Sequence, residues 1–261
     1  MKHEKLGTVF SIANQKGGVG KTTTSINLAS SLAVLGKRVL LMDLDPQGNT
    51  TSGLGIDKNQ VQKGMYELLM GEAALKDVIV KSEYEGLYLV PATMDLAGSE
   101  VELVNQNERE YCLKKSCEQY QGKAFDYVLI DCPPALNMLT INALTLSNRV
   151  MITLQTEFYA LEGLSQLMDT IRRIRSALNP NLVLDGILLT MVDRRNNLSI
   201  QVENEVREYF GKQVYQQSIP RNVRLSEAPS YGVPAMYHDI QSKGAQAYLQ
   251  LAHELIQRQN V

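Results

Sequence analysis

Short apolar runs alternate with segments of helical periodicity along nearly the whole chain. Apolar runs of strand length occupy residues 8–13, 38–42, 87–90, 125–130, 150–154, 182–192 and 214–219. Apolar spacing typical of helices covers residues 22–35, 100–120, 138–147, 161–178, 199–210 and 241–257, and two short helices are predicted within residues 61–81. Several strands are continuously apolar, as expected where both faces of a sheet are covered. The alternation predicts an α/β fold: a doubly wound, mostly parallel sheet with helices on both faces.

Composition favours one globular domain over residues 1–261. The chain is 44% hydrophobic, enough for a sizeable core, and neither an internal repeat nor a low-complexity linker interrupts the alternation. The residues before the first strand are polar, and no apolar run reaches the length that crosses a bilayer. The three cysteines lack metal-ligand spacing, which fits a reducing compartment. We therefore expect a cytoplasmic protein with a single domain.

The stretch KGGVGKTTT, residues 16–24, lies between the first predicted strand and the first predicted helix. Strand, glycine-rich turn and helix in this order are the context that a phosphate-binding loop requires. Glycines let backbone N–H groups point at phosphate oxygens, and the helix adds its positive N-terminal end. Lys21 supplies a charge for the outer phosphates, and the hydroxyl of Thr22 can ligate Mg²⁺. The residues expected to contact the nucleotide here are Lys16, Gly17, Gly18, Val19, Gly20, Lys21, Thr22 and Thr23.

Acidic residues follow two other predicted strands. Asp131 closes the fourth strand, the arrangement called Walker B, and its carboxylate can hold Mg²⁺ while Thr22 binds the ion directly. Asp43 and Asp45 follow the second strand and, two residues apart on an extended chain, face the same way. The carboxyl ends of parallel strands are where such folds bind ligands. A turn-capping or helix-capping role is the alternative for each of these aspartates.

The phosphate-binding loop departs from its common form at one position. The common form GxxxxGK[ST] needs glycine where this chain has Gln15, and a second lysine, Lys16, follows it. KGGxGKT is instead the signature of the deviant Walker A ATPases. With the motifs DLDPQGNTTSGLG, EFYALEGLSQL and IPRNVRLSEAPSYG, nearly the whole chain resembles the ParA/MinD family of P-loop NTPases, most closely the chromosomal ParA proteins, also called Soj.

The resemblance implies an ATPase that uses ATP and Mg²⁺ and acts as a molecular switch. In the family the signature lysine, here Lys16, reaches the phosphates bound by the partner subunit, so that ATP joins two monomers and hydrolysis releases them. The second aspartate of the DxDPQ motif, here Asp45, positions the attacking water. Lys16 and Asp45 are thus the expected catalytic residues, and Asp43 supports them. Pro220 and Asn222 are expected near the adenine.

A basic region in the C-terminal half contrasts with the mildly acidic chain. Residues 172–224 contain nine Arg or Lys and five Asp or Glu, a net charge of about +4 in a chain of −2. Such asymmetry is what non-specific DNA binding needs. The resemblance implies DNA partitioning, in chromosome or plasmid segregation: an ATP-bound homodimer on double-stranded DNA of the nucleoid, released when a ParB-like partner stimulates hydrolysis. Arg194, Arg195 and Arg224 are the expected DNA contacts, with solvated helix faces as the alternative for any single arginine.

The main alternative function is a MinD-like, membrane-associated regulator of the division site. That reading needs a C-terminal amphipathic helix with bulky apolar and basic faces, whereas residues 247–261 contain one Lys or Arg and neither Phe nor Trp. A nitrogenase-reductase type would need a cysteine pair for an iron–sulfur cluster, and Cys132 stands alone. A tyrosine kinase of this loop class would carry a C-terminal tyrosine cluster, but the twelve tyrosines are dispersed.

Overall fold

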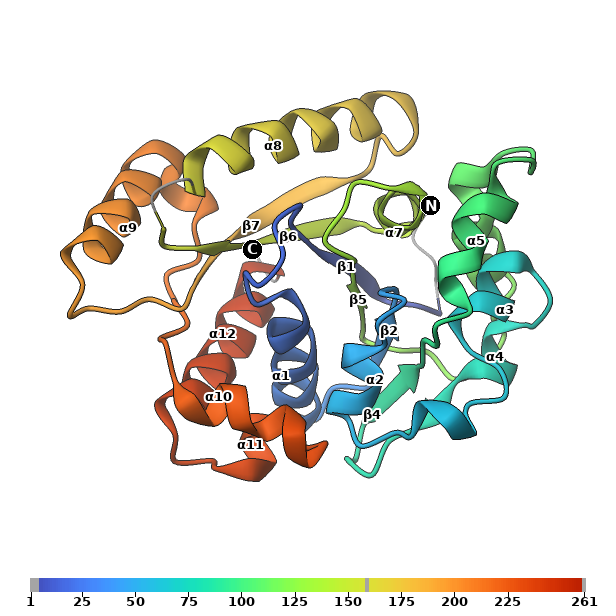
Figure 1. Ribbon diagram of the computed structural model, residues 1–261, viewed down its shortest axis with the longest axis horizontal. Coiled ribbons are helices and arrows are strands. Elements are labelled where there is room, and N and C mark those ends of the chain that lie inside the picture. Colours follow the sequence, from blue (N-terminus) through green and yellow to red (C-terminus); the bar gives the residue numbers. More distant parts are fainter. Residues whose placement is uncertain (1–4, 158–159, 260–261) are drawn as a thin grey trace.

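A seven-stranded sheet forms the centre of the computed structural model, which describes residues 5–157 and 160–259 (Figure 1). The strands are β1 Thr8–Ala13, β2 Val39–Asp43, β3 Val80–Lys81, β4 Leu87–Val90, β5 Tyr127–Asp131, β6 Arg149–Gln155 and β7 Val183–Thr190. Their order across the sheet is β3-β4-β2-β5-β1-β6-β7, and every pair is parallel except β3 with β4. The predicted fold class, a doubly wound and mostly parallel sheet, is confirmed.

Helices cover both faces of the sheet. They are α1 Lys21–Val34, α2 Asn49–Gly53, α3 Met65–Met70, α4 Leu75–Val78, α5 Leu96–Leu103, α6 Cys112–Glu118, α7 Met138–Leu146, α8 Ala160–Ala177, α9 Asn197–Phe210, α10 Val223–Glu227, α11 Ala235–His238 and α12 Lys243–Gln259. Figure 1 shows α1 and α12 on one side of the strands and α8 on the other. Alternate residues of β2 enter two separate apolar clusters, Leu40 and Met42 one, Val39 and Leu41 the other. No helix among the described residues is long and apolar enough to cross a membrane.

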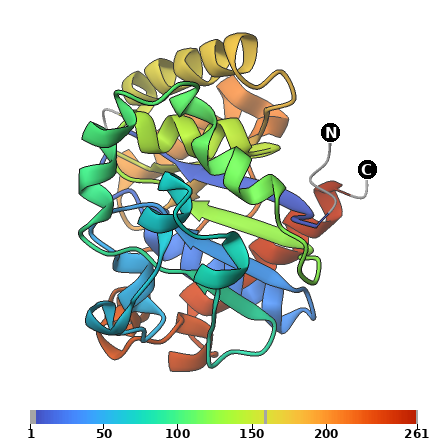
Figure 2. The same ribbon diagram turned by 90° about the vertical axis from the view of Figure 1, so that its right-hand side faces the viewer.

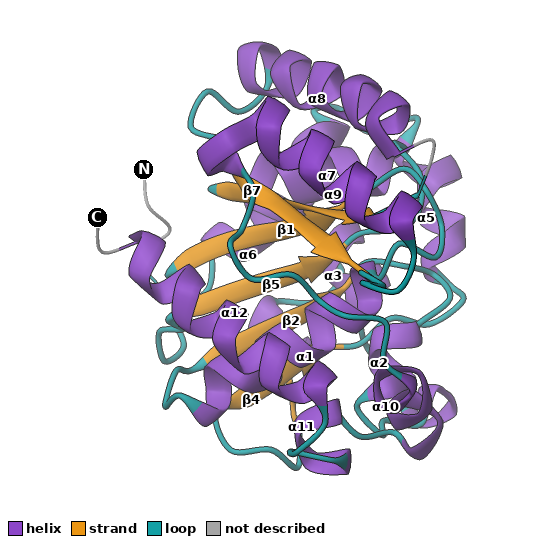
Figure 3. Cartoon of the chain, turned by 90° about the vertical axis from the view of Figure 1, so that its left-hand side faces the viewer, coloured by secondary structure: helices purple, strands orange, loops and turns teal. Residues whose placement is uncertain are grey.

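The carboxyl ends of the parallel strands meet along one edge of the sheet. Figures 2 and 3 show these strands pointing the same way, so the segments that follow β1, β2 and β5 emerge side by side. The register fixes this arrangement, since Asp43 at the end of β2 is paired with Asp131 at the end of β5. Motifs separated by many residues in the sequence are thereby brought to a single place.

The expected long helix over residues 100–120 is wrong. The chain instead forms α5, a 3₁₀ turn at Arg109–Tyr111, and α6, with Glu108 in the left-handed region at φ 53°. A side chain from α7 holds this break: Asn142 donates to the carbonyl of Arg109 (2.8 Å) and accepts from the amide of Leu113 (3.1 Å). Satisfying these backbone groups from outside replaces the bonds of a continuous helix.

Two further segments differ from their expected form. Residues 214–219 do not form a regular strand; isolated bridges join Val214 to Ile187 of β7, and Pro220 to Val192 just beyond the end of β7. The polar stretch after Asp45, where the apolar pattern predicts no helix, contains the short helix α2, which begins after Gly48 in the left-handed conformation (φ 62°). Both differences lie beside the candidate site described next.

Candidate functional site

The loop between β1 and α1 presents an open, glycine-lined backbone. Gly18 and Gly20 have φ of 74° and 84°, values that L-residues rarely adopt. A Cβ at Gly17 or Gly18 would meet no atom within 4 Å. The backbone conformation at position 18, and not a lack of space, therefore favours glycine there. The side chain of Asn14 anchors the loop, accepting from the amide of Lys16 (2.9 Å) and donating to the carbonyl of Thr153 on β6 (2.6 Å). No motif or periodic pattern in the sequence indicates these contacts of Asn14.

The two lysines of the loop lie in different surroundings. Lys21 is almost completely buried, its Nζ donates to the carbonyl of Lys16 (3.0 Å), and burial lowers its pKa against the opposing effect of Asp131. The side chain of Lys16 is 54% exposed and forms a 2.8 Å ion pair with Glu157, which follows β6. Lys21 therefore points into the site of its own chain, whereas Lys16 lies on the surface beside it.

Asp131 is fully buried and receives three hydroxyl groups. Its Oδ2 accepts from Thr22 (2.8 Å) and from Thr50 on α2 (2.7 Å), and its Oδ1 accepts from Ser25 on α1 (3.0 Å). Burial raises the pKa of Asp131, an effect that the three hydrogen bonds and the Lys21 charge oppose. The structure thus brings Thr22 and Asp131, the two predicted magnesium ligands, into direct contact. The contact of Ser25 could have been predicted from the sequence, because Ser25 lies one helical turn after Thr22. No local sequence pattern indicates the contact of Thr50.

Asp43 and Asp45 form the adjoining acidic wall. Asp43 is buried and its Oδ2 accepts from the amide (2.8 Å) and hydroxyl (2.7 Å) of Thr51. Burial, aided by the negative charge of Asp131, raises the pKa of Asp43 to about 7. One oxygen of Asp45 accepts from the amide of Gln47 (2.9 Å). A buried acid such as Asp43, whose ionisation is disfavoured in this way, is stabilised as a carboxylate by a nearby cation.

A cavity of about 240 Å³ opens beside the amino end of α1. Its lining includes Gly20 and Thr23 of the loop together with Pro220 and Asn222, so the predicted base contacts and the phosphate loop share one cavity. The Oδ1 atom of Asn222 is buried and has no hydrogen-bond partner among the described residues. Within the same residues, no cluster of three or more His, Cys, Asp or Glu could hold a metal ion. A cation here would rely on mixed ligands such as Thr22 and Asp131.

The predicted DNA contacts separate into two places. Arg194 and Arg195 line a groove of about 700 Å³ together with Arg221 and Lys243, two cations that the sequence analysis did not single out as DNA contacts. Arg195 is 88% exposed and forms a forked ion pair with Asp193, both contacts being 3.0 Å. Arg224 lies on α10 outside this lining, and it is paired with acidic side chains at 2.8 and 3.3 Å. These partners are Glu227 and Asp239.

One arginine of the predicted basic region has a different environment. Arg207, on α9, pairs with Glu203 (2.9 Å) and donates to the carbonyls of Tyr215 (2.9 Å) and Gln216 (3.3 Å). Its guanidinium binds backbone within the protein and not an open surface. The count of nine basic residues therefore overstates the charge that faces solvent.

Known proteins resemble the chain over almost its whole length. Residues 7–184 match a family described as "AAA domain". The chromosome partitioning protein ParA of Caulobacter vibrioides is 54% identical over 252 residues, 96% of this chain and 94% of that protein. The sporulation initiation inhibitor protein Soj of Bacillus subtilis is also 54% identical, over 96% of this chain and 98% of its own.

Solved structures share the fold. A cobyrinic acid a,c-diamide synthase from Mycobacterium smegmatis, with bound ADP and magnesium, has a TM-score of 0.85 and 37% identity over 98% of this chain and 96% of its own. The septum site-determining protein MinD of Pyrococcus horikoshii, complexed with Mg-ADP, has a TM-score of 0.80 and 26% identity over 96% of each chain. Together with the loop, the paired Thr22 and Asp131, and the sequence relatives, these likenesses show that the chain belongs to the ParA/Soj family of P-loop ATPases.

Proposed function

We propose that the protein is a DNA-partitioning ATPase that dimerises on ATP, binds double-stranded DNA without sequence preference, and leaves it when a ParB-like partner stimulates hydrolysis. The observation that carries the proposal is the buried carboxylate of Asp131, which receives the hydroxyls of Thr22 and Thr50 beside a loop that bears two lysines. This arrangement links the phosphate loop directly to α2, the segment that follows Asp45. A change at the outer phosphates would therefore be transmitted to the acidic wall formed by Asp43 and Asp45.

The residues present fit Mg²⁺ and ATP. Thr22 and Asp131 would hold the ion, and bound Mg²⁺ supplies positive charge to the outer phosphates. Lys21 would add a second charge there, while the open backbone of the glycine loop would contact the phosphates. The unpartnered Oδ1 atom of Asn222 is an acceptor suited to the amino group of adenine, and Pro220 would pack against the ring.

Asp45 would position the attacking water. Its hydrogen bond from the amide of Gln47 fixes one carboxylate oxygen, and in the described part of the chain the other oxygen makes no hydrogen bond. That oxygen is available to orient a water and to accept its proton as the phosphate bond breaks. Asp43, which has a raised pKa, would have a supporting role instead, because its hydrogen bond from Thr51 holds α2 against the end of β2.

Lys16 would act across the dimer. Its ion pair with Glu157 is about half exposed on both sides, and such pairs contribute only ~0–1 kcal/mol. Releasing Lys16 from Glu157 to a phosphate of the partner subunit therefore costs little. A phosphate held by Lys16 of one chain and Lys21 of the other would join the two monomers.

The groove lined by Arg194, Arg195, Arg221 and Lys243 would hold the DNA backbone. Four cations face one carboxylate in this lining, that of Asp193. Because each phosphate contact steepens the salt dependence of binding, pairing two grooves in a dimer would raise affinity at low salt. By contrast, the apolar face of α12, which includes Leu251 and Leu255, is buried in the core and is not presented to a membrane.

The test is the affinity of Asp45→Ala protein for random duplex DNA, with and without ATP, at several salt concentrations. We expect ATP-dependent binding that falls steeply with salt and is abolished by Arg195→Glu. Arg172→Glu is the matched control, because Arg172 is also an exposed arginine paired with an aspartate, Asp169, but lies on α8 outside the groove. DNA binding that does not depend on ATP, or equal losses of DNA affinity in Arg195→Glu and Arg172→Glu, would contradict the proposal. The DNA affinity of Arg224→Glu shows whether α10 contributes to DNA binding.

A further inference from the structure

Residues 214–221 lead into the base cavity but do not pair regularly with β7. The two bridges join Val214 to Ile187 and Pro220 to Val192. The bridged positions are six residues apart in this segment but only five residues apart in the neighbouring stretch from Ile187 to Val192. One extra residue must therefore be accommodated between the bridges. Backbone bonds to β7 remain on either side of the looped-out stretch, where the amide of Tyr215 donates to the carbonyl of Ile187 (3.0 Å) and the amide of Ile219 donates to that of Leu189 (2.8 Å). Such a bulge leaves amides without strand partners.

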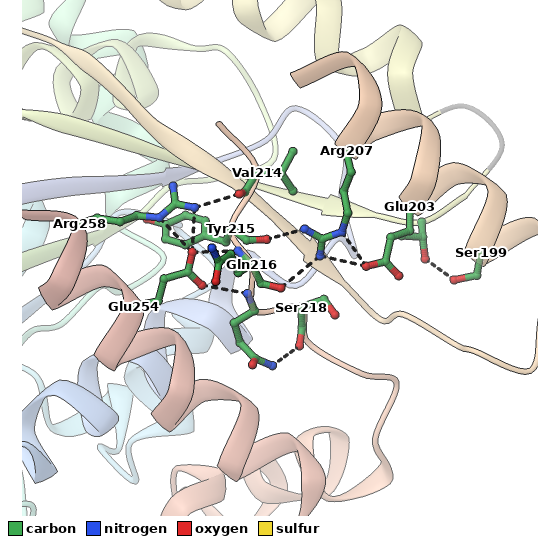
Figure 4. Close-up of polar contacts among 11 residues, drawn as sticks. Ser199, Glu203, Arg207, Val214, Tyr215, Gln216, Ser218, Glu254 and Arg258 are labelled. Carbon is green, nitrogen blue, oxygen red and sulfur yellow. Dashed lines mark hydrogen bonds and ion pairs between the residues drawn. The ribbon is translucent and has the colours of Figure 1, made fainter. Parts of the chain in front are cut away.

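A single carboxylate takes up the two freed amides. Oε1 of Glu254, on α12, accepts from the amide of Gln216 (2.8 Å), and Oε2 accepts from the amide of Gln217 (2.9 Å). Arg258, one turn later on α12, holds Glu254 (2.8 Å) and donates to the carbonyl of Val214 (2.9 Å). Figure 4 shows both α12 side chains reaching the same stretch of backbone. These hydrogen bonds involve charged groups and are stronger than neutral ones.

A third side chain holds the segment from the opposite side. Arg207 of α9 donates to the carbonyls of Tyr215 and Gln216, and Glu203 orients its guanidinium (Figure 4). Backbone groups of four consecutive residues, 214–217, are thus bound by three charged side chains from two helices. In a regular strand the neighbouring strand would supply these bonds.

We propose that Glu254, with Arg258 and Arg207, sets the register of residues 214–221 and so positions Pro220 and Asn222 against the base of the nucleotide. These three are positioning residues, since they line neither the base cavity nor the phosphate loop. A slip of the segment by one residue would exchange the side chains that face the cavity. The inference rests on the proposed placement of the base beside Asn222.

The chemistry of the two glutamates supplies a matched pair of variants. Glu254 uses both oxygens as acceptors for backbone amides, so in Glu254→Gln the side-chain NH₂ would face an N–H donor. Glu203 needs one oxygen, Oε1, to hold Arg207, and a glutamine can supply that oxygen. The same substitution therefore disrupts the segment at position 254 and spares it at position 203.

The experiment compares the affinities of ADP and of inorganic pyrophosphate, both with Mg²⁺, by calorimetry. We expect Glu254→Gln to weaken ADP binding about tenfold while pyrophosphate binding changes less than about twofold, because only ADP carries the base. Glu203→Gln should bind both ligands as the wild type does. Arg207→Lys, which loses one of two carbonyl bonds, is a second and milder variant with the same expected selectivity.

Two outcomes would overturn the inference: unchanged ADP affinity in Glu254→Gln and Arg207→Lys, or equal losses for ADP and pyrophosphate, which indicate general destabilisation. Asn222→Ala separates this result from the proposed base site. If Asn222→Ala weakens ADP selectively and Glu254→Gln does not, the positioning role is wrong. If Asn222→Ala leaves ADP affinity unchanged, the placement of the base itself is wrong. Far-UV circular dichroism at the assay temperature confirms that each variant is folded.

Discussion

Replacing Lys16 by alanine should abolish ATP-dependent dimerisation without unfolding the monomer. Among the residues that the structure describes, the ammonium group of Lys16 in the monomer has one acidic partner, Glu157, at 2.8 Å, and both side chains are about half exposed. Exposed ion pairs of this kind contribute ~0–1 kcal/mol to folding. The free energy of unfolding of Lys16→Ala should therefore lie within about 1 kcal/mol of the wild-type value.

The expected effect on the dimer is much larger. A hydrogen bond to a charged group is worth ~1.5–3 kcal/mol, and a two-fold dimer would contain two contacts from Lys16 to the partner's phosphates. Losing both contacts removes ~3–6 kcal/mol of binding free energy, which raises the dissociation constant of the dimer by a factor of about 10²–10⁴. Binding of ADP to the monomer should persist, because Lys21 of the same chain remains in place. Lys21→Ala, in contrast, should weaken nucleotide binding itself.

Sedimentation velocity with a non-hydrolysable ATP analogue and Mg²⁺ measures the dimer, and urea unfolding measures the monomer. Lys115→Ala is the matched control, since Lys115 forms a comparably exposed ion pair, with Glu108 at 2.6 Å, far along the chain from the phosphate loop. We expect the control to dimerise normally. A Lys16→Ala protein that dimerises as tightly as the control would refute a contact across the dimer.

Three other predictions follow from single contacts. Asp45→Ala should slow ATP turnover by about 10²–10⁴ and trap the ATP-bound dimer, measured by phosphate release and sedimentation; wild-type turnover would remove Asp45 from the reaction. Thr50→Val removes a 2.7 Å donor to a buried carboxylate and should cost ~1–3 kcal/mol in urea unfolding, whereas Thr93→Val, at an exposed 3.2 Å bond to an aspartate, should cost little. Burial raises the pKa of two thiols to about 12 and also raises the pKa of the third, which is only partly buried, so at pH 8 one thiol should react with a disulfide reagent faster than the other two, and all three should react in denaturant. The slow thiols are Cys117 and Cys132, and the fast one is the half-buried Cys112.

The sequence predicted the elements and contacts that depend on local patterns. Continuous apolar runs located the strands. The motifs placed Thr22 at the start of the first helix and Asp131 at a strand end, and the fold brings the two side chains within 2.8 Å. Pro220 and Asn222, the base contacts that the family resemblance predicts, also line the cavity beside the loop. In each case a residue's position along its own element determines where it lies in the fold.

Contacts that join distant segments through single side chains were not predictable. Thr50 donates to an aspartate 81 residues away, and Asn14 to a carbonyl 139 residues away, with no periodic signal for either. Arg207 was counted with solvent-facing charges because its sequence surroundings resemble those of any exposed, charged helix. The long helix over 100–120 failed for the same reason: the polar side chain that interrupts it, Asn142, belongs to another element.

The base cavity and the basic groove share a wall formed by Pro220 and Arg221, so nucleotide and DNA would contact two sides of one segment. A monomer with four groove cations can make at most four such phosphate contacts, a salt slope of about −3.6, and a dimer twice that, about −7. Over a tenfold change in salt, the steeper slope alone alters affinity by several further powers of ten. In the proposed mechanism, ATP would therefore control DNA binding through dimerisation even without movement of the shared wall. A movement of that wall would instead change the affinity of the monomer, so the salt slope of nucleotide-bound monomer and dimer distinguishes the two effects.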